Sequence, residues 1–198
     1  MKKLVIATQN RNKFKEMKEA LDGLGWELVP GFEFPGIPEV IEDGATLEEN
    51  SLKKAKEVSD FTSLPALSDD TGLFVDALNG QPGIYAARFA GEKCTYEDNV
   101  RKMLGMMENV PDGKRRALFR TVITIHHPGN KVQQVAGEVS GIITNKPMGA
   151  HGFGYDPIFQ PDGSSKVFAE MSLEEKNRIS HRGLALQRAR ELLLSGNF

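Results

Sequence analysis

Residues 3–8 read Lys-Leu-Val-Ile-Ala-Thr, a short and almost continuous apolar run near the start of the chain. Such a run is typical of a central strand that is covered on both faces. Apolar residues at helical spacing then predict a helix over 12–24, which Gly23 and Gly25 end. A strand near 27–29 completes a β-α-β unit, so this stretch decides that the fold is α/β.

Later segments extend this unit into a larger sheet. Strand-like composition at 115–126, a turn at 128–130 and a returning segment at 131–144 predict an antiparallel hairpin. A strand-like segment at 65–78 is interrupted by Ser-Asp-Asp-Thr-Gly at 68–72, where we expect the chain to turn at the end of the sheet.

Capping sequences mark the helices that follow the first one. They predict helix starts at Thr46, Thr95, Ser172 and Ser180. We therefore expect a long mixed β-sheet with flanking helices, in a single domain that spans residues 1–198.

Composition excludes several classes of function. The net charge of -2 provides no basic field for long nucleic acids, and no apolar stretch approaches the length of a membrane span. A single cysteine, Cys94, forms neither a disulfide framework nor a cysteine-rich metal site. We expect a cytoplasmic protein that binds neither membrane nor nucleic acid.

The first motif with chemical meaning is Thr8-Gln9-Asn10-Arg11-Asn12-Lys13, where the first strand meets the first helix. Backbone N–H groups at a helix N-terminus, with a lysine one turn in, bind anions. The alternative is that Thr8 or Asn10 merely caps the helix while Lys13 lies on a solvated face.

The second motif is the acidic pair Asp69-Asp70, followed by Thr71. Neighbouring carboxylates are costly unless a cation or protons relieve them, and carboxylate oxygens suit Mg²⁺. An Asp-rich turn that caps local N–H groups is the alternative. Glu42, and Lys54 in the second helix, are further candidates, although a solvated helix face explains Lys54 better when that motif is taken alone.

Two further segments offer groups that suit a nucleobase. Phe153, between Gly152 and Gly154, offers a stacking face, and the carboxylate of Asp156 is able to accept a hydrogen bond from a ring N–H. Lys176, His181 and Arg182 are candidate donors to a base carbonyl. The alternatives are a structural loop around Phe153 and a capped, solvated helix start.

Six collinear motifs resemble the inosine triphosphate pyrophosphatase family, the Ham1- or RdgB-like dITP/XTP pyrophosphatases. The resemblance covers nearly the whole chain and rests on Thr8 to Lys13, Glu49 to Lys54, Ser68 to Leu73, Pro82 to Arg88, Gly152 to Phe159 and Ser180 to Gly183. It implies a long mixed sheet with two lobes around a central cleft, an ITPase-like or Maf-like architecture, and a homodimer.

The resemblance also implies roles for single residues. Asp70 matches a catalytic proton acceptor with Asp69 beside it, and Glu42 and Asp70 match ligands of Mg²⁺. Glu39 lies close to Glu42, so the choice between these two acids stays open. The implied substrate contacts are Thr8, Gln9, Asn10, Arg11, Asn12, Lys13, Lys54, Thr71, Phe153, Gly154, Tyr155, Asp156, Lys176, His181 and Arg182.

The sequence therefore predicts hydrolysis of non-standard purine nucleoside triphosphates, such as ITP, dITP, XTP and dXTP, to the monophosphate and pyrophosphate. Two alternatives are a Maf-like pyrophosphatase for modified pyrimidine nucleotides and a nucleotide- or RNA-binding module without turnover. The acidic cluster disfavours the second, because acids repel phosphates unless a metal intervenes.

Overall fold

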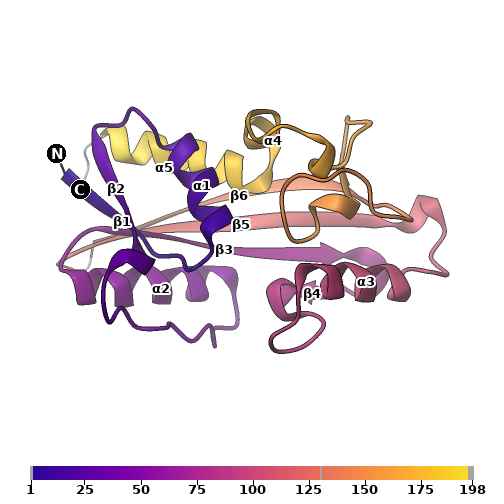
Figure 1. Cartoon of the computed structure of the whole chain (residues 1–198), viewed down its shortest axis with the longest axis horizontal. Coiled ribbons are helices and arrows are strands. Elements are labelled where there is room, and N and C mark those ends of the chain that lie inside the picture. Colours follow the sequence, from indigo (N-terminus) through magenta and orange to yellow (C-terminus); the bar gives the residue numbers. More distant parts are fainter. Residues whose placement is uncertain (1, 130, 196–198) are drawn as a thin grey trace. The chain divides into compact units, whose positions relative to one another are not determined.

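The computed structural model describes residues 2–129 and 131–195, as shown in Figure 1. Its α-helices are α1 (Arg11–Ala20), α2 (Leu47–Thr62), α3 (Tyr96–Met106), α4 (Leu173–Ile179) and α5 (His181–Ser195). Its strands are β1 (Lys2–Ile6), β2 (Trp26–Pro30), β3 (Ala66–Val75), β4 (Pro82–Gly83), β5 (Arg116–His127), β6 (Lys131–Ile143) and β7 (Phe159–Pro161).

The strands form one mixed sheet in the order β2-β1-β3-β5-β6-β7, with β4 paired to β3. β1 runs parallel to both β2 and β3, whereas β4 is antiparallel to β3 and β7 is antiparallel to β6. The predicted α/β class, β-α-β start and mixed sheet are therefore confirmed. β5 and β6 are sheet neighbours, as a hairpin requires, and Asn130 of the predicted turn lies outside the described residues.

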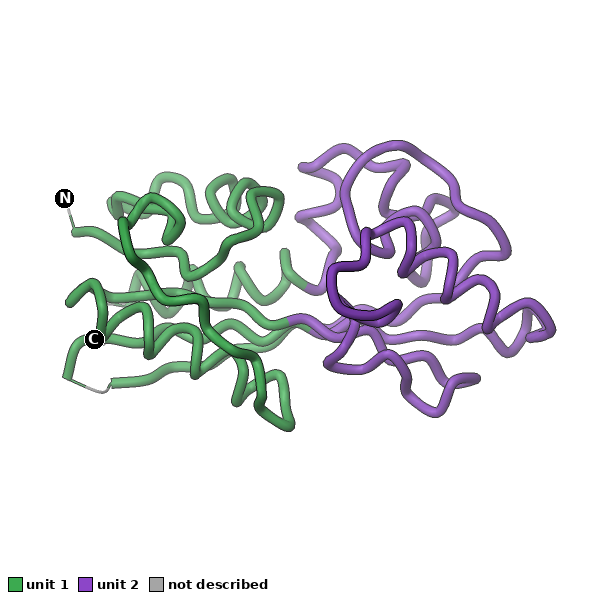
Figure 2. Tube along the Cα trace, turned by 60° about the horizontal axis from the view of Figure 1, so that its bottom comes forward, with its two compact units in different colours: residues 1–70, 121–137, 182–198 green, residues 71–120, 138–181 purple. Residues whose placement is uncertain are grey.

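Two compact units make up the chain, coloured separately in Figure 2. Unit 1 comprises residues 1–70, 121–137 and 182–198, and unit 2 comprises residues 71–120 and 138–181. The chain passes from one unit to the other within β3, β5 and β6, and again after His181, the first residue of α5. A single domain with a cleft stays a prediction.

Unit 1 has apolar packing on both faces of β1. Leu4 and Ile6 pack with Met17 of α1 and Leu186 of α5, and Val5, which points to the opposite face, belongs to the cluster that includes Val58 of α2. Figure 1 shows α1 and α5 on one side of these strands and α2 on the other. The continuous apolar run thus forms the doubly covered strand that its composition predicts.

Unit 2 has its own apolar core. Met103 and Met107 at the end of α3 pack with strand residues such as Leu73 and Phe119. Phe119 also contacts the rings of Phe159 and Phe168, with centroids 4.6 and 6.4 Å away. These side chains fix the loop segments that surround β7.

Two local predictions are wrong. Residues 68–72 do not turn at the end of the sheet, because β3 continues through them from Ala66 to Val75. The first helix ends at Ala20 rather than at residue 24, and Gly23 and Gly25 adopt positive φ angles of 73° in the turn that follows. Among the described residues, no helix combines the length and apolar character needed to cross a bilayer.

Candidate active site

The segment from Thr8 to Lys13 forms the N-terminal turn of α1. Asn10 is the N-cap, and its Oδ1 accepts hydrogen bonds from the backbone N–H groups of Asn12 and Lys13 at 2.9 and 3.2 Å. The Asn10 N–H donates to Thr8 Oγ1 at 3.1 Å. Gln9, Arg11 and Asn12 are exposed. α1 therefore begins in a polar turn that includes Lys13. The ammonium of Lys13 points inward, toward Asp69, rather than to solvent.

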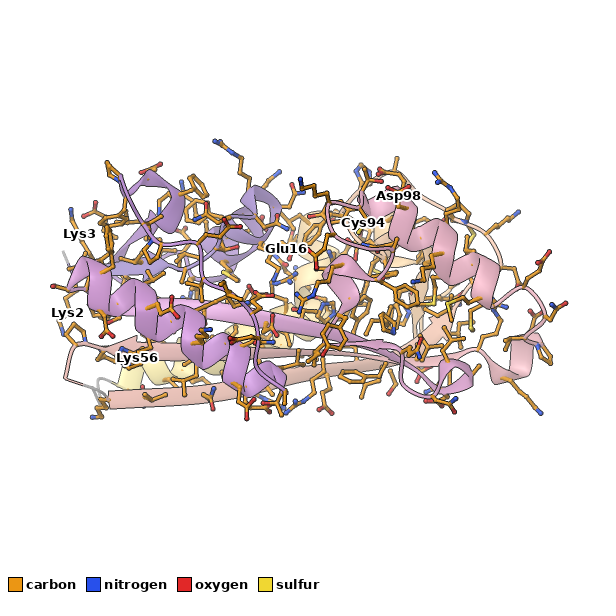
Figure 3. All side chains as sticks on the ribbon, turned by 90° about the horizontal axis from the view of Figure 1, so that it is seen from below. Lys2, Lys3, Glu16, Lys56, Cys94 and Asp98 are labelled. Atoms are coloured by element: carbon orange, nitrogen blue, oxygen red, sulfur yellow. The ribbon has the colours of Figure 1, made fainter. Side chains whose placement is uncertain are left out.

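Asp69 is the centre of a buried ion-pair network in unit 1. Lys13 Nζ lies 3.2 Å from Asp69 Oδ1 and 3.1 Å from Oδ2, and Arg182 donates through Nε and Nη2 to Oδ2 at 3.1 and 3.0 Å. Arg182 Nη1 also donates to Glu16 at 2.6 Å. Glu16, labelled in Figure 3, is buried on α1.

These contacts fix the charge of Asp69. Burial opposes its ionisation, but the positive charges of Lys13 and Arg182 hold the pKa of Asp69 well below its usual range. Burial also lowers the pKa of Lys13, against the pull of Asp69. Glu16 adds a second acid, so the ion pairs among these four side chains join two positive groups to two negative ones.

Asp70 has a different environment, although it is the next residue. Its Oδ1 accepts from Lys54 Nζ at 3.0 Å, and the same ammonium also contacts Glu42 Oε1. Burial raises the pKa of Asp70, and the charge of Glu42 adds to this effect. Burial disfavours charge on Lys54 as well, yet Asp70 and Glu42 raise its pKa overall. Lys54 therefore stays charged between two acids.

The second oxygen of Asp70 is the feature that fits a metal. Asp70 Oδ2 is buried, and it has no hydrogen-bond partner among the residues that the structure describes. Glu42 reaches the same ammonium, whereas Glu39 is exposed, which favours Glu42 over Glu39 as the second acid. No group of three or more acidic, histidine or cysteine side chains that suits a metal occurs within residues 2–129 and 131–195. Two carboxylates nevertheless suffice for Mg²⁺ when phosphate oxygens complete its shell.

In unit 2, a glycine-rich loop holds Phe153 over a buried ion pair. Lys176 Nζ lies 2.6 Å from Asp156 Oδ2 and 4.9 Å from the centroid of the Phe153 ring. The backbone N–H of Phe153 donates to the same Asp156 oxygen at 2.8 Å. Gly152 is required here, because a Cβ would lie 2.1 Å from Asp156 Oδ2.

A pocket of about 480 Å³ lies beside this loop. Phe153 lines it together with Tyr96 of α3, whose ring centroid is 5.7 Å away, and with the exposed His151. Tyr155 faces the core instead, where its hydroxyl donates to the carbonyl of Ala86 at 2.9 Å. Burial raises the pKa of that hydroxyl, so Tyr155 stays neutral.

His181 lies in the aromatic core of unit 2. Its ring stacks on Phe119 with centroids 4.3 Å apart and an interplanar angle of 13°, and Phe168 lies 6.1 Å away. A hydrogen bond to a base therefore has to come from an edge of a ring that is 3% exposed. The predicted base contact of His181 stays a prediction.

The structure thus separates the predicted site residues into two groups. Unit 1 holds Thr8, Gln9, Asn10, Arg11, Asn12, Lys13, Glu42, Lys54, Asp69, Asp70 and Arg182, and unit 2 holds Thr71, Phe153, Gly154, Tyr155, Asp156, Lys176 and His181. Sequence reasoning missed Glu16, Tyr96 and His151. The spacing of Glu16, three residues after Lys13 and thus on one helix face, was the available signal for that acid.

Comparison with known proteins gives the family. The Ham1 family profile matches residues 4–192. A dITP/XTP pyrophosphatase of Caldanaerobacter subterraneus is 50% identical over 196 residues, which is 98% of this chain and 97% of that protein. One of Geobacter sulfurreducens is 48% identical over 94% of each chain.

Solved structures agree with this result. A HAM1 protein from Coxiella burnetii superposes with a TM-score of 0.89 at 38% identity, over 99% of this chain and 100% of that one. A nucleoside-triphosphatase / dITP/XTP pyrophosphatase from Mycobacterium abscessus has a TM-score of 0.75 at 39% identity, over 94% and 98% of the two chains. With this fold and these relatives, the chain belongs to the Ham1 family.

Proposed function

We propose that the chain hydrolyses non-standard purine nucleoside triphosphates, such as ITP, dITP, XTP and dXTP, to the monophosphate and pyrophosphate, with Mg²⁺ as cofactor. The observation that supports this most directly is the pair Glu42 and Asp70 on one lysine, with an unpartnered buried oxygen on Asp70. The activity named for the relatives matches that chemistry.

The acids of unit 1 would bind the metal, and its lysines would bind the triphosphate. Glu42 and Asp70 are the candidate ligands, and Mg²⁺ bound there would neutralise phosphate charge. Lys13 and Lys54 supply fixed positive charge beside them. Asp70 is the group that accepts a proton from water as the water oxygen bonds to the α-phosphorus. The bond from that phosphorus to its bridging oxygen breaks, and pyrophosphate leaves with the oxygen.

The ion pair of Lys176 and Asp156 in unit 2 offers a donor and an acceptor that would select the base. Lys176 provides N–H donors and Asp156 provides an acceptor, beside the stacking face of Phe153. Hypoxanthine and xanthine offer a 6-oxo acceptor and an N1–H donor, which complement this pair, whereas adenine offers the reverse. Guanine shares both groups with hypoxanthine, so its rejection depends on its 2-amino group rather than on this pair. Each unsatisfied buried group costs about 1–3 kcal/mol, or roughly 5- to 150-fold in discrimination.

A pyrophosphate-release panel tests the proposal. Purified protein with Mg²⁺ should hydrolyse ITP and XTP far faster than ATP or GTP, and chelation of the metal should stop the reaction until Mg²⁺ is restored. Equal rates on all four nucleotides would refute the selectivity. Faster turnover of a modified pyrimidine triphosphate would favour the Maf-like alternative, and nucleotide binding without release would favour a binding module.

Lys176→Met provides a matched variant for the base contact. It should lower the ratio of ITP to ATP turnover, because the donor to the 6-oxo group is lost, while the contacts of Lys13 and Lys54 with their acids remain. An unchanged ratio in the folded variant would remove Lys176 from base selection.

We further propose that the protein acts as a cytoplasmic homodimer. The family resemblance suggests the dimer, and the single cysteine suits a reducing compartment. Cys94, labelled in Figure 3, is half-buried with its Sγ 3.3 Å from Asn99 Oδ1. Sedimentation equilibrium at micromolar concentration tests the assembly, and a monomeric mass would contradict it.

A further inference from the structure

The acidic loop before α2 lies against that helix in register. Glu42 contacts Lys54, Asp43 contacts Lys53 at 2.7 Å, and the Gly44 N–H donates to Asn50 Oδ1 at 2.8 Å. The next N–H along the loop, that of Ala45, donates to Glu49 at 2.6 Å. The loop therefore runs antiparallel to the first two turns of α2, and Glu42 lies at its far end.

The contacts differ in burial. The Asp43 and Lys53 side chains are 66% and 33% exposed, so water and salt screen their pair. Asn50 is 1% exposed, and its bond to Gly44 is therefore protected from competing water. The Lys54 and Glu42 side chains are 12% and 30% exposed. The hydrogen bond from Gly44 to Asn50 is therefore the contact of the loop whose helix partner is most deeply buried.

Gly44 and Asn50 are also matched in shape. A Cβ on Gly44 would lie 2.7 Å from Asn50 Oδ1 and 2.8 Å from Glu49 Cβ, both closer than real Cβ contacts. Any side chain at residue 44 therefore separates the loop from the helix. The same contact is thus specified from both sides, by an acceptor on α2 and by the absence of a side chain in the loop.

We propose that Asn50 and Gly44 form a clamp that positions Glu42 for metal binding. Asn50 touches neither metal nor nucleotide in this proposal; it acts through the loop backbone. Without the clamp, Glu42 loses its fixed distance from Asp70, and the two acids no longer act together on one cation. The inference rests on the proposed function, since it concerns the Mg²⁺ site of that reaction.

Asn50→Leu and Gly44→Ala test the clamp from its two sides. Partners that hold a metal ligand in place typically contribute about 10- to 100-fold to metal affinity. Each variant should therefore raise the Mg²⁺ concentration for half-maximal pyrophosphate release by about 10- to 100-fold, with little change in the KM for ITP at saturating Mg²⁺. Electron paramagnetic resonance of Mn²⁺, added to the protein without nucleotide, should show the same loss of affinity.

Two control variants separate positioning from general damage. Asn50→Asp keeps an acceptor oxygen of the same reach and should keep Mn²⁺ affinity within about threefold of the wild type. Lys53→Met removes the exposed neighbouring pair and should leave Mn²⁺ affinity within about twofold.

The clamp is overturned if folded Asn50→Leu and Gly44→Ala bind Mn²⁺ as the wild type does, or if Lys53→Met weakens binding equally. Where Asn50→Leu does not fold, Gly44→Ala decides, because it leaves the buried amide in place. A wild-type protein that releases no pyrophosphate from ITP would refute the proposed function instead, and the Mn²⁺ titration still tests the clamp on its own.

Discussion

Replacing Arg182 with methionine should lower the free energy of unfolding, because Arg182 joins Asp69 to Glu16 in the buried network. Arg182 is 3% exposed and donates to Asp69 at 3.0 and 3.1 Å and to Glu16 at 2.6 Å. Removing one partner of a buried ion pair costs about 3–5 kcal/mol, because the other charge is left without compensation. Lys13 still faces Asp69, so Glu16 is the acid that loses its contact with the guanidinium in Arg182→Met.

Urea unfolding at pH 7 measures this loss. With a slope of about 2 kcal/mol per M, a loss of 3–5 kcal/mol lowers the midpoint by roughly 1.5–2.5 M. The double variant Glu16→Gln, Arg182→Met removes the charge of Glu16 as well and keeps the pair of Lys13 and Asp69, so it should recover most of the stability. A single-variant loss below about 1 kcal/mol, or no recovery in the double variant, would refute the reasoning.

The difference in stability between wild type and Arg182→Met should depend on pH in one direction. The pKa of Asp69 is lower in the folded chain than its unperturbed value of 3.8. The stability that Asp69 contributes is therefore present above that value and is lost as the pH falls toward the folded pKa. Arg182→Met removes one of the charges that lower the pKa of Asp69. The difference in unfolding free energy between wild type and variant should therefore be largest at neutral pH and should become smaller below about pH 4.

Three further variants probe other parts of the chain. Gly141→Ala would place a Cβ 2.3 Å from the Gln160 carbonyl oxygen, so overpacking of about 1–3 kcal/mol should lower the Tm by roughly 2–12 °C; an unchanged Tm in calorimetry would contradict this. Asp70→Asn should reduce pyrophosphate release by about 10²- to 10⁴-fold with the circular dichroism spectrum retained, and a variant that keeps most activity would move the catalytic role elsewhere. Arg116→Met breaks an exposed pair with Asp162, at 2.6 and 2.8 Å, and should cost at most about 1 kcal/mol in urea unfolding; a loss above 2 kcal/mol would show that the pair is not screened.

Features that depend on neighbouring residues were predictable from the sequence. Thr95 and Ser172 form reciprocal capping boxes with acids three positions later, as their motifs predict. Thr46 also caps its helix, but Glu49 accepts from Ala45 rather than from the backbone of the cap residue. Hydrogen bonds between residues close in sequence determine where these helices begin, so a short motif is enough to predict each helix start.

The position of the acidic pair was not predictable in this way. Two carboxylates within an apolar segment suggested a turn, because a buried strand normally excludes adjacent charges. β3 nevertheless continues through them, since Asp69 meets Lys13 from 56 residues away and Arg182 from 113 residues away. Hydrophobic periodicity reports only on neighbouring residues, so it does not predict which distant residues supply the opposite charges.

The surroundings of the predicted base-binding residues also depend on residues that are distant in sequence. Lys176, His181 and Arg182 cluster in sequence, but consecutive side chains on a helix point about 100° apart. Arg182 is committed to Asp69 and Glu16, and the His181 ring is packed on Phe119. For either side chain to bind a base, it would have to compete with these buried contacts. Lys176 is also buried, but its partner Asp156 is itself the proposed acceptor for the base and lies beside the stacking face of Phe153, so a base can bind both groups together. Selectivity between hypoxanthine and adenine should therefore depend more strongly on Lys176 than on His181 or Arg182.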